Sequence, residues 1–336
     1  MKIRFFDPGT GYKKLSWEMI PEIDRVLTYG DLILRNDVEV FEKKLAEYSG
    51  AKYSVGLNSG TDALILSLKA TGIGEGDEVI TSGHTFWATV EAILHVGAKP
   101  ILADIDREAT IDPDSIKTLI TKKTKAIIPV HIAGNVCEME RILEIAKEHD
   151  LRIIEDSAQA IGATKLWGDI ACYSFYPAKI LGSYGDAGAI VTNNEDIYEL
   201  IKKLRNHGGK PPEMLGYNSR LDNLQAAILN VKFKYLNDSI KRRKEIAQRY
   251  DKLFEQENSR EIYQDYIVFF KDGLKKHLEG KGIETIDDTY PFPEEYEKPK
   301  MVKIWEKYAL RIPCNENLTE EEVNYIIKII NEFFNR

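Results

Sequence analysis

Short apolar runs alternate with amphipathic segments along most of the chain from about residue 51. Small polar residues, glycine or proline bound each run, which is typical of buried strands. The segments between the runs carry apolar residues at helical spacing, so strands and helices are predicted to alternate. This order predicts an α/β fold with a mainly parallel central sheet and helices on both faces. The predicted strands are Tyr53–Leu57, Glu78–Thr81, Lys99–Ala103, Lys125–Val130, Leu151–Glu155, Ala171–Ser174 and Ala189–Thr192.

The start or length of several helices can also be predicted. Asp112 and Pro113 combine an N-cap with a proline that suits the first helical turn. Another helix is predicted over about Glu138–His149. The charged segment from Leu221 to about Gln256 carries apolar residues at i, i+3, i+7 and i+10, which predicts one long helix leaving the first domain.

The pattern changes in the remaining residues, roughly 257–336, which predict a smaller α+β unit. Ile262–Phe270 is strand-like, Gly273–Leu278 suits a short helix, and Pro291–Pro299 is rich in proline. The last helix opens at Thr319 with a capping box to Glu322, in which each residue satisfies a backbone N–H of the other.

The length of 336 residues also suggests two domains, since a typical domain has about 150 residues. We predict a large domain over residues 1–240, which includes the N-terminal segment, and a small C-terminal domain over residues 241–336. The candidate chemistry described below falls in the large domain.

Charge and composition narrow the classes of partner. The chain has 46 basic and 54 acidic residues, a net charge of −8, so it lacks the basic excess that a nucleic-acid binder needs. No run approaches the roughly 18 apolar residues of a membrane-spanning helix, and we expect no membrane partner. Three cysteines lie far apart, which is typical of a reducing compartment and predicts a cytoplasmic protein.

The segment Asn58-Ser-Gly-Thr-Asp62 lies between the first predicted strand and a helix predicted over Ala63–Lys69. Small polar residues there expose backbone N–H groups at a helix N-terminus, where the helix dipole also favours an anion. The same residues suit an ordinary N-cap with a tight glycine turn. No dinucleotide-binding glycine motif opens this unit and no P-loop motif occurs in the chain, so neither a dinucleotide-binding site nor a P-loop is supported.

Two further candidate groups follow predicted strands. Asp156 lies at a strand end, where ligands of open α/β sheets bind, and can either fix a cationic ring nitrogen or cap the next turn. Lys179 follows another strand among glycines and can form a Schiff base with an aldehyde, or have a purely structural role. An anion cradle, a ring-nitrogen acid and a reactive amine together are what pyridoxal phosphate (PLP) requires.

Five segments in a fixed order carry a more specific pattern. They are NSGTDAL at 58–64, HTFWAT at 84–89, EDSAQAIGA at 155–163, YSFYPAKILGSYGDAGAI at 173–190 and YNSRLDNLQAAIL at 217–229. With these segments the chain resembles the PLP-dependent sugar aminotransferases of the DegT/DnrJ/EryC1/StrS family, which have the fold type I architecture. The resemblance runs over roughly residues 30–250 and more loosely to the end.

The resemblance implies roles for individual residues. Lys179 would form the Schiff base with PLP and later carry a proton, and Asp156 would keep the pyridine nitrogen protonated. Gln159 would lie near the ring hydroxyl. Phe86 would stack on the ring, with Trp87 as the neighbouring alternative. The residues that would hold the phosphate are Gly60, Thr61 and Ser174.

Asn218 would reach the phosphate of the cofactor bound by a partner subunit, which implies a homodimer with shared active sites. An alternative is that Asn218 is only a turn residue before the helix that follows. For the basic run Lys241-Arg-Arg-Lys244 we expect a solvated helix face. The six histidines lack a zinc-binding HExxH spacing, so no metal site is expected.

Some positions depart from the family pattern. Ala178, Ile180 and the sequence GDAG replace residues that are more common in the family, although these changes leave cofactor attachment believable. The stretch that begins at Tyr290 lacks the histidine of the family's YPxPxH-like pattern, and this part of the chain is expected to be shortened. The side that faces the sugar is therefore where this chain differs most from the family.

The resemblance implies a transaminase that moves an amino group from glutamate to a nucleotide-linked keto sugar. The form SRLD at 219–222 is closer to members that act on 3-keto than on 4-keto sugars. Two alternatives stay open: a PLP-dependent sugar dehydratase or lyase, and a non-catalytic regulatory homologue. The retained Lys179 argues against the first, because dehydratase relatives replace this lysine.

Overall fold

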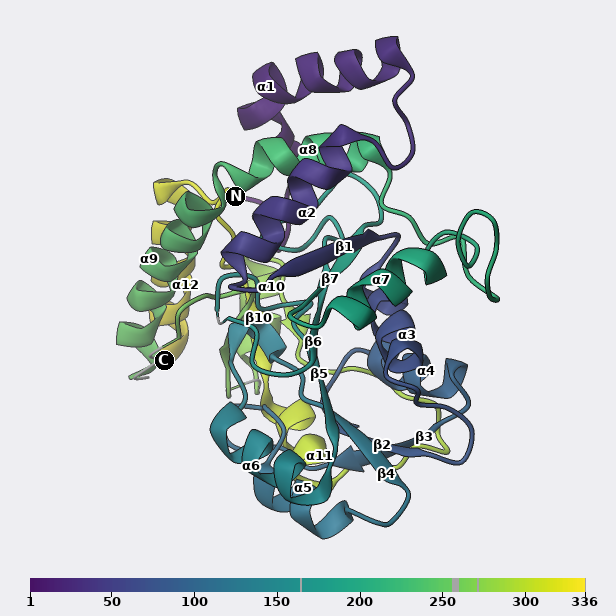
Figure 1. Cartoon of the computed structure of the whole chain (residues 1–336). Helices are drawn as coiled ribbons and strands as arrows, with labels where there is room; N and C mark the ends of the chain where they lie inside the picture. Colours follow the sequence, from purple (N-terminus) through teal and green to yellow (C-terminus); the bar gives the residue numbers. More distant parts are fainter. Residues whose placement is uncertain (164, 256–259, 271, 336) are drawn as a thin grey trace.

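The computed structural model describes residues 1–163, 165–255, 260–270 and 272–335 (Figure 1). Within these residues, a seven-stranded sheet forms the centre of a large α/β unit, and a three-stranded sheet forms a smaller one. The strand order of the large sheet is β1-β7-β6-β5-β4-β2-β3. Its strands are β1 (Tyr53–Leu57), β2 (Glu78–Ser82), β3 (Lys99–Ala103), β4 (Thr124–Ile128), β5 (Arg152–Asp156), β6 (Ile170–Ser174) and β7 (Gly188–Thr192).

The large sheet is mainly parallel, as predicted. β7 alone among its strands runs the other way, since it pairs antiparallel with both β1 and β6. The carboxyl ends of the remaining strands therefore meet at one edge of the sheet, and this edge includes the ends of β1, β5 and β6. All seven strands predicted from the sequence are confirmed, with boundaries that differ by at most two residues.

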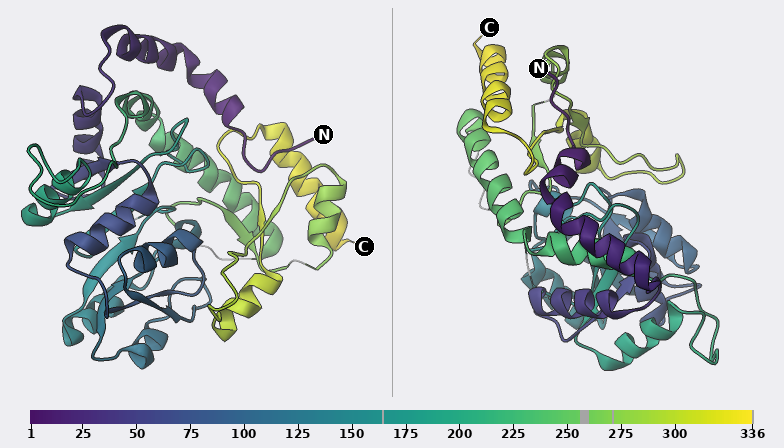
Figure 2. Two further views of the ribbon diagram at one scale, coloured as in Figure 1. Left: turned by 90° about the vertical axis from the view of Figure 1, so that its right-hand side faces the viewer. Right: turned by 90° about the horizontal axis from the view of Figure 1, so that it is seen from above.

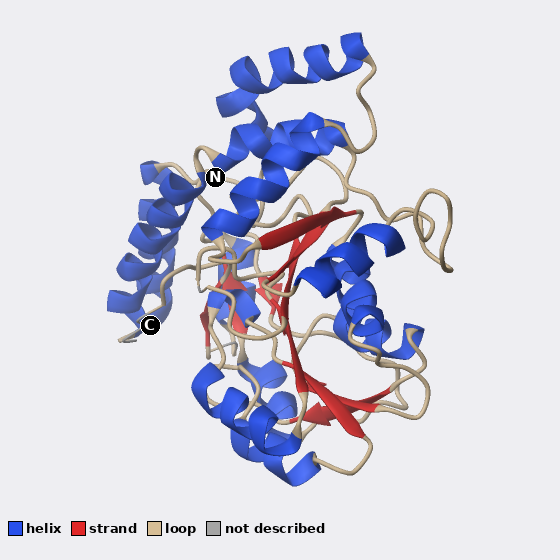
Figure 3. Ribbon diagram, viewed as in Figure 1, coloured by secondary structure: helices blue, strands red, loops and turns tan. Residues whose placement is uncertain are grey.

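Helices cover both faces of this sheet (Figure 3). Alternate strand residues point to opposite faces: Ile154 packs with one set of helices, whereas Ile153 packs with another. One face is covered by α3 (Gly60–Ala70), α4 (Trp87–His95) and α7 (Glu195–Leu204). The opposite face is covered by α2 (Asn36–Tyr48), α5 (Pro113–Leu119), α6 (Met139–His149) and α8 (Asn223–Phe233).

The predicted long helix from Leu221 to Gln256 is wrong in its continuity. The structure has two helices, α8 and α9 (Leu236–Phe254), while Gln256 lies outside the described residues. α8 packs along its length on the central sheet and on α1 (Pro8–Tyr29). α9 begins in the same core with Leu236, but its later residues Ile246, Ala247 and Tyr250 pack in the core of the smaller unit. The helix is interrupted at residues 234–235, where the chain leaves the large unit for the smaller one.

The smaller unit is built on the antiparallel strand order β8-β10-β9. The predicted strand over Ile262–Phe270 is present only in its centre, as β8. The capping box of Thr319 and Glu322 is confirmed at the start of the last helix. The elements of this unit are β8 (Tyr266–Val268), β9 (Ile286–Asp287), β10 (Leu310–Ile312), α10 (Leu274–Gly280), α11 (Lys300–Tyr308) and α12 (Glu320–Phe334).

The beginning of the chain lies with this smaller unit. Ile3 forms a bridge with Ile283 and is fully buried in the same apolar core as α9, α10 and α12. Both views of Figure 2 show the N-terminal residues beside the C-terminal elements. We infer that the small domain consists of the C-terminal region together with the first residues of the chain. No described helix is long and apolar enough to cross a bilayer.

Candidate active site

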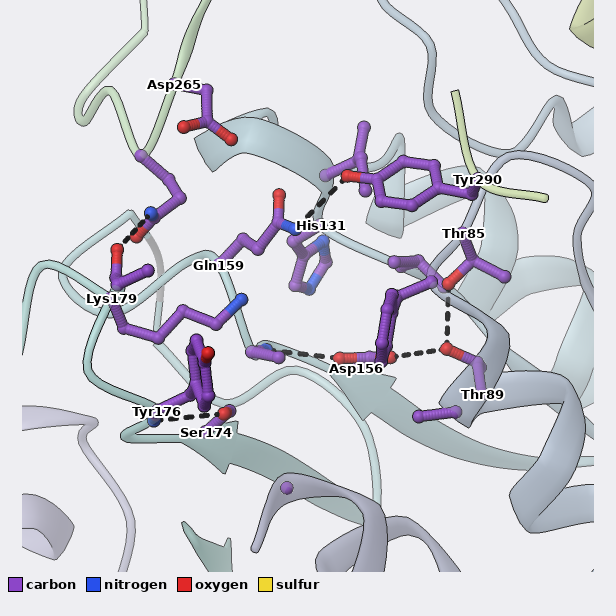
Figure 4. Close-up of a pocket in the computed structure, with 18 of the residues that line it drawn as sticks. Thr85, Thr89, His131, Asp156, Gln159, Ser174, Tyr176, Lys179, Asp265 and Tyr290 are labelled. Carbon is purple, nitrogen blue, oxygen red and sulfur yellow. Dashed lines mark hydrogen bonds between the residues drawn. The ribbon is translucent and has the colours of Figure 1, made fainter. Parts of the chain in front are cut away.

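A cavity of about 740 Å³ lies where the carboxyl edge of the central sheet faces the smaller unit. Its lining includes Ser59, Asp156 and Lys179 from the large unit, together with Asp265 and Arg311 from the segments around β8 and β10. The structure therefore brings together side chains that are separated by as much as 250 residues in the sequence. Figure 4 shows the side chains that surround this cavity.

One end of the cavity is formed by the N-terminus of α3 and the end of β6. Ser59 caps α3 by accepting a hydrogen bond from the backbone N–H of Asp62 at 3.0 Å, so the N-cap interpretation is correct for this side chain. Gly60 and Thr61 follow at the first turn and line the cavity with Ser174. A Cβ on Gly60 would lie 2.8 Å from the Cβ of Ser174, so only glycine permits this close approach. The first turn of α3 thus presents backbone N–H groups to an anion.

Asp156 is held by two hydrogen bonds on the floor of the cavity. Its Oδ1 accepts from the backbone N–H of Ala158 at 3.1 Å, and its Oδ2 accepts from the hydroxyl of Thr89 at 2.8 Å. Because that hydroxyl donates to Asp156, the neighbouring Thr85 hydroxyl donates to Thr89, at 2.7 Å. Both threonines are fully buried, so the direction of the carboxylate is fixed. Their role could not be assigned from the HTFWAT segment alone.

The Lys179 side chain extends into the cavity toward the space between Gln159 and Asp156 (Figure 4). No hydrogen-bond partner of its Nζ is found among the described residues. Burial lowers the pKa of the amine, and the nearby Asp265 and Asp156 only partly oppose this effect. A lysine with a lowered pKa supplies more of the neutral amine, which is the nucleophilic form.

Gln159 is fixed from both ends of its amide. Its Oε1 accepts from the backbone N–H of Ala133 at 2.7 Å, and its Nε2 donates to the hydroxyl of Tyr290 at 3.3 Å. Tyr290 also accepts from Arg311. Tyr290 marks the start of the stretch that departs from the family pattern, and the structure places it in the cavity lining.

Of the two aromatic candidates, the structure places Phe86 at the cavity and Trp87 away from it. Phe86 precedes the first residue of α4 and lines the cavity with 63% of its side chain exposed. The Trp87 ring instead packs against the rings of Phe292 and Tyr296, each with a centroid distance of 5.4 Å. A flat ligand in this cavity would therefore contact the Phe86 ring.

Asn218 is not part of this cavity. It is exposed at the base of the loop between α7 and α8, which projects from the large unit in Figure 1. Its backbone forms an isolated bridge with Asn206. The loop tip includes Leu215, whose side chain is 92% exposed. Asn218 therefore does not line the cavity of its own chain, although the next residue, Ser219, donates a hydrogen bond to Asp62 at the start of α3.

Arg311 is the main charged group of the cavity that the sequence does not reveal. Its Nε donates to Asp288 at 2.7 Å and its Nη1 to Asp265 at 2.9 Å. Asp288 also accepts from Trp305 and contacts His84. Although Arg311 is almost fully buried, two carboxylates compensate its charge, as a buried guanidinium requires.

The expectation for the basic run 241–244 is wrong for Arg243. Its side chain is 3% exposed and lines the cavity, with Nε donating to Glu316 at 2.7 Å. Its Nη1 donates to the carbonyl oxygens of Tyr263 and Gln264. Arg243 lies on the inward side of α9 together with the apolar residues Ile246, Ala247 and Tyr250. The charge pattern alone does not reveal which basic residue of the run takes this side.

The described residues fit three parts of PLP. The first turn of α3, where Gly60 allows close approach, suits the phosphate, and the fixed carboxylate of Asp156 suits the ring nitrogen. The Lys179 amine, unpaired among the described residues, suits the aldehyde. The model of the DegT/DnrJ/EryC1/StrS aminotransferase family matches residues 14–267. The chain belongs to this family. It is accordingly a fold type I aminotransferase that uses PLP as its cofactor.

Known proteins resemble the chain along nearly its whole length. The "Pleiotropic regulatory protein" of Geobacillus stearothermophilus is 39% identical, with 99% of each chain covered. The UDP-2-acetamido-2-deoxy-3-oxo-D-glucuronate aminotransferase of Pseudomonas aeruginosa is 37% identical, with 87% of each covered. The crystal structure of DesV from S. venezuelae superposes with a TM-score of 0.94 at 32% identity, covering 100% of this chain and 99% of DesV.

The alignment with the Geobacillus protein spans 370 positions, more than the 336 residues of this chain. Gaps in this chain account for the difference. The relative therefore contains internal segments that this chain lacks.

Proposed function

We propose that the protein transfers an amino group from glutamate to the keto group of a nucleotide-linked sugar. The observation that carries the proposal is the Lys179 amine, which enters the same cavity as the fixed carboxylate of Asp156. Membership of an aminotransferase family supports the class of reaction. The Pseudomonas relative is named as an aminotransferase of a UDP-linked 3-oxo sugar, which supports a sugar nucleotide as the acceptor.

Lys179 and Asp156 would each have a distinct role in the reaction. PLP would supply an aldehyde that condenses with amines and a ring that withdraws electrons from the substrate carbon. Lys179 would hold the cofactor as a Schiff base at rest and then move a proton at its Nζ, for which its lowered pKa is suited. Asp156 would keep a proton on the ring nitrogen, since a fixed carboxylate stabilises the cationic ring.

The remaining residues would position the cofactor. Phe86 would lie against the face of the ring, and Gln159 would lie near the ring hydroxyl. Because the Gln159 amide is already oriented by Ala133 and Tyr290, its direction would not change when the cofactor binds. The phosphate would be held by Gly60, Thr61 and Ser174.

We further propose a homodimer in which Asn218 reaches the cofactor phosphate of the partner subunit. The position of Asn218 on the surface, outside the cavity of its own chain, supports this arrangement. Large apolar side chains on α1 are exposed, including Trp17 at 69% and Tyr29 at 75%, which supports a surface that a second subunit covers.

For the substrate, we propose a keto group at C3 of the sugar. The SRLD form of residues 219–222 and the 3-oxo sugar in the Pseudomonas relative's name support this position. We also propose a cytoplasmic location, which is supported by the three cysteines of the chain, all buried and free. A mass-spectrometric screen of 3-keto and 4-keto sugar nucleotides would identify the acceptor.

The proposal predicts a defined spectrum. The purified protein should absorb in the visible range, glutamate should bleach this band, and a keto sugar nucleotide should restore it. Reduction with borohydride should attach the mass of the cofactor to Lys179. Lys179→Ala should lose both the band and the adduct, whereas Lys147→Ala, which changes an exposed lysine of α6, should keep both. A covalent band that persists in Lys179→Ala would overturn the proposal.

A regulatory role is a second candidate, and the printed name of the Geobacillus relative favours it. The two candidates differ in the response to the amino donor. If PLP binds but no amino acid converts it to its amine form, the regulatory role is supported and transamination is not. An elimination reaction would instead give a deoxy sugar without nitrogen, which product analysis distinguishes from an amino sugar.

A further inference from the structure

The peptide groups on both sides of Lys179 are bound by one side chain from the smaller unit. Gln264 lies just before β8 and is 6% exposed. Its Oε1 accepts from the backbone N–H of Ile180 at 3.1 Å, and its Nε2 donates to the backbone carbonyl of Ala178 at 3.0 Å. The amide thus pairs with the residue before and the residue after Lys179, as a neighbouring strand would.

The backbone of Gln264 reaches the other side of the cavity. Its N–H donates to the carbonyl oxygen of Ala133 at 3.2 Å. The N–H of Ala133 in turn donates to Oε1 of Gln159. Ala133 has a φ of 53°, an uncommon conformation that its surroundings must maintain. Gln264 therefore contacts the peptide segments that carry or orient both Lys179 and Gln159.

Gln264 is itself fixed by charged groups. Arg243 donates to its carbonyl oxygen at 2.7 Å and is paired with Glu316. The next residue, Asp265, accepts from Arg311. Since Arg243, Asp265 and Arg311 are buried, the segment 263–265 has little freedom to move, and its hydrogen bonds hold the Lys179 loop in one conformation.

We propose that Gln264 is a positioning residue: it fixes the backbone around Lys179 and thereby orients the Lys179 amine toward the cofactor. This inference rests on the proposed role of Lys179 as the Schiff-base residue. The chemistry of the side chain fits the task, because an amide combines one acceptor and a donor at a spacing that matches the two peptide groups. An apolar residue of the same size would leave a buried N–H and a buried carbonyl without partners.

The test compares Gln264→Leu with Gln248→Leu, which changes an exposed glutamine of α9. In Gln264→Leu, we expect the rate of Schiff-base formation with added PLP to fall about tenfold, the effect of a 1.4 kcal/mol higher barrier. The pH at which the visible band changes form should shift by about half a unit or more. In the proposed transamination, kcat should fall while KM for the amino donor stays unchanged. Gln248→Leu should match the wild type in every measurement.

Far-UV circular dichroism shows whether Gln264→Leu is folded. If it does not fold, Gln264→Asn, which keeps the amide but is shorter, should show the slower Schiff-base formation. Wild-type rates and an unchanged pH profile in a folded variant would overturn the role of Gln264 and leave that of Lys179 intact. A wild-type protein without a visible band would overturn the proposed function and this inference with it.

Discussion

At the scale of single residues, Thr89 is the side chain that donates a hydrogen bond to Asp156. Thr89→Val keeps the shape of the side chain but removes its hydrogen bond to the carboxylate. A hydrogen bond to a charged group contributes roughly 1.5–3 kcal/mol, so we expect the transamination rate constant to fall about ten- to a hundredfold while PLP stays bound. Single-turnover kinetics would measure this effect. Thr89→Ser, which retains the hydroxyl, should keep most of the activity, and equal losses in both variants would contradict the explanation.

The sequence predicts a site residue well when elements next to it in the chain determine its position, and poorly when distant segments do. Asp156 and Lys179 lie in motifs that follow a strand directly, so the predicted strands bring them to one edge of the sheet. Arg311 and Gln264 lie in no motif, and they reach the cavity only because the smaller unit packs against that edge. Gln264 contacts a segment more than 80 residues away, and Arg311 is held by carboxylates of two other segments, and periodicity shows neither kind of contact.

At the scale of elements, α9 shows how a buried charge joins a helix to the site. Arg243→Met would remove the partner of the partly buried Glu316 and the donor to the 263–264 carbonyls. Leaving a carboxylate without its partner costs at most about 3–5 kcal/mol in the free energy of unfolding, the value for a fully buried pair. Urea denaturation should show a loss of up to this size. Lys241→Met, in the same basic run but exposed, should change stability by less than about 0.5 kcal/mol.

Two errors in the helix predictions, the missing α1 and the single helix in place of α8 and α9, have a common cause. α1 begins at Pro8 and contains Gly9 and Gly11, which are usually signs of a turn, yet Asp7 caps it by accepting from the N–H of Thr10. The predicted single helix fails for the related reason that α8 stays on the large unit, whereas the later turns of α9 pack in the core of the smaller one. In both cases the local signals are ambiguous, and tertiary packing decides which conformation forms.

At the scale of the whole molecule, the buried carboxylates predict a loss of stability in acid. Burial raises the pKa of Asp288, but Arg311, His84 and Trp305 more than offset this effect and lower it overall. Burial likewise raises the pKa of Glu316, and Arg243 outweighs it. A folded-state pKa below the unfolded value stabilises the fold above that unfolded value, about 4, and this stability disappears as pH falls further.

Urea denaturation between pH 7 and pH 3 should therefore give a free energy of unfolding that decreases below about pH 5. Asp288→Asn removes one of the two groups, so its curve should fall less steeply in acid than that of the wild type. Parallel curves for the two proteins would show that Asp288 does not contribute to the pH dependence.

The proposed sharing of active sites between subunits predicts complementation between two inactive variants. A dimer of Lys179→Ala with Asn218→Asp would contain one site with an intact lysine and an intact partner asparagine. Random association gives half heterodimers, so the mixture should recover roughly a quarter of wild-type activity. A mixture of Lys179→Ala with Asp156→Ala should recover none, because both residues belong to the same chain's cavity. Equal activity of the two mixtures would argue against shared sites.

The bridge between Ile3 and Ile283 has a consequence for folding during synthesis. Ile3 is translated 280 residues before its partner. The large unit can form in the meantime, since its strands and helices lie between these two positions. The segment around Ile3 cannot dock in its native place until Ile283 has been translated. The core of the smaller unit is thus completed late, and only then does this unit add its residues to the cavity lining.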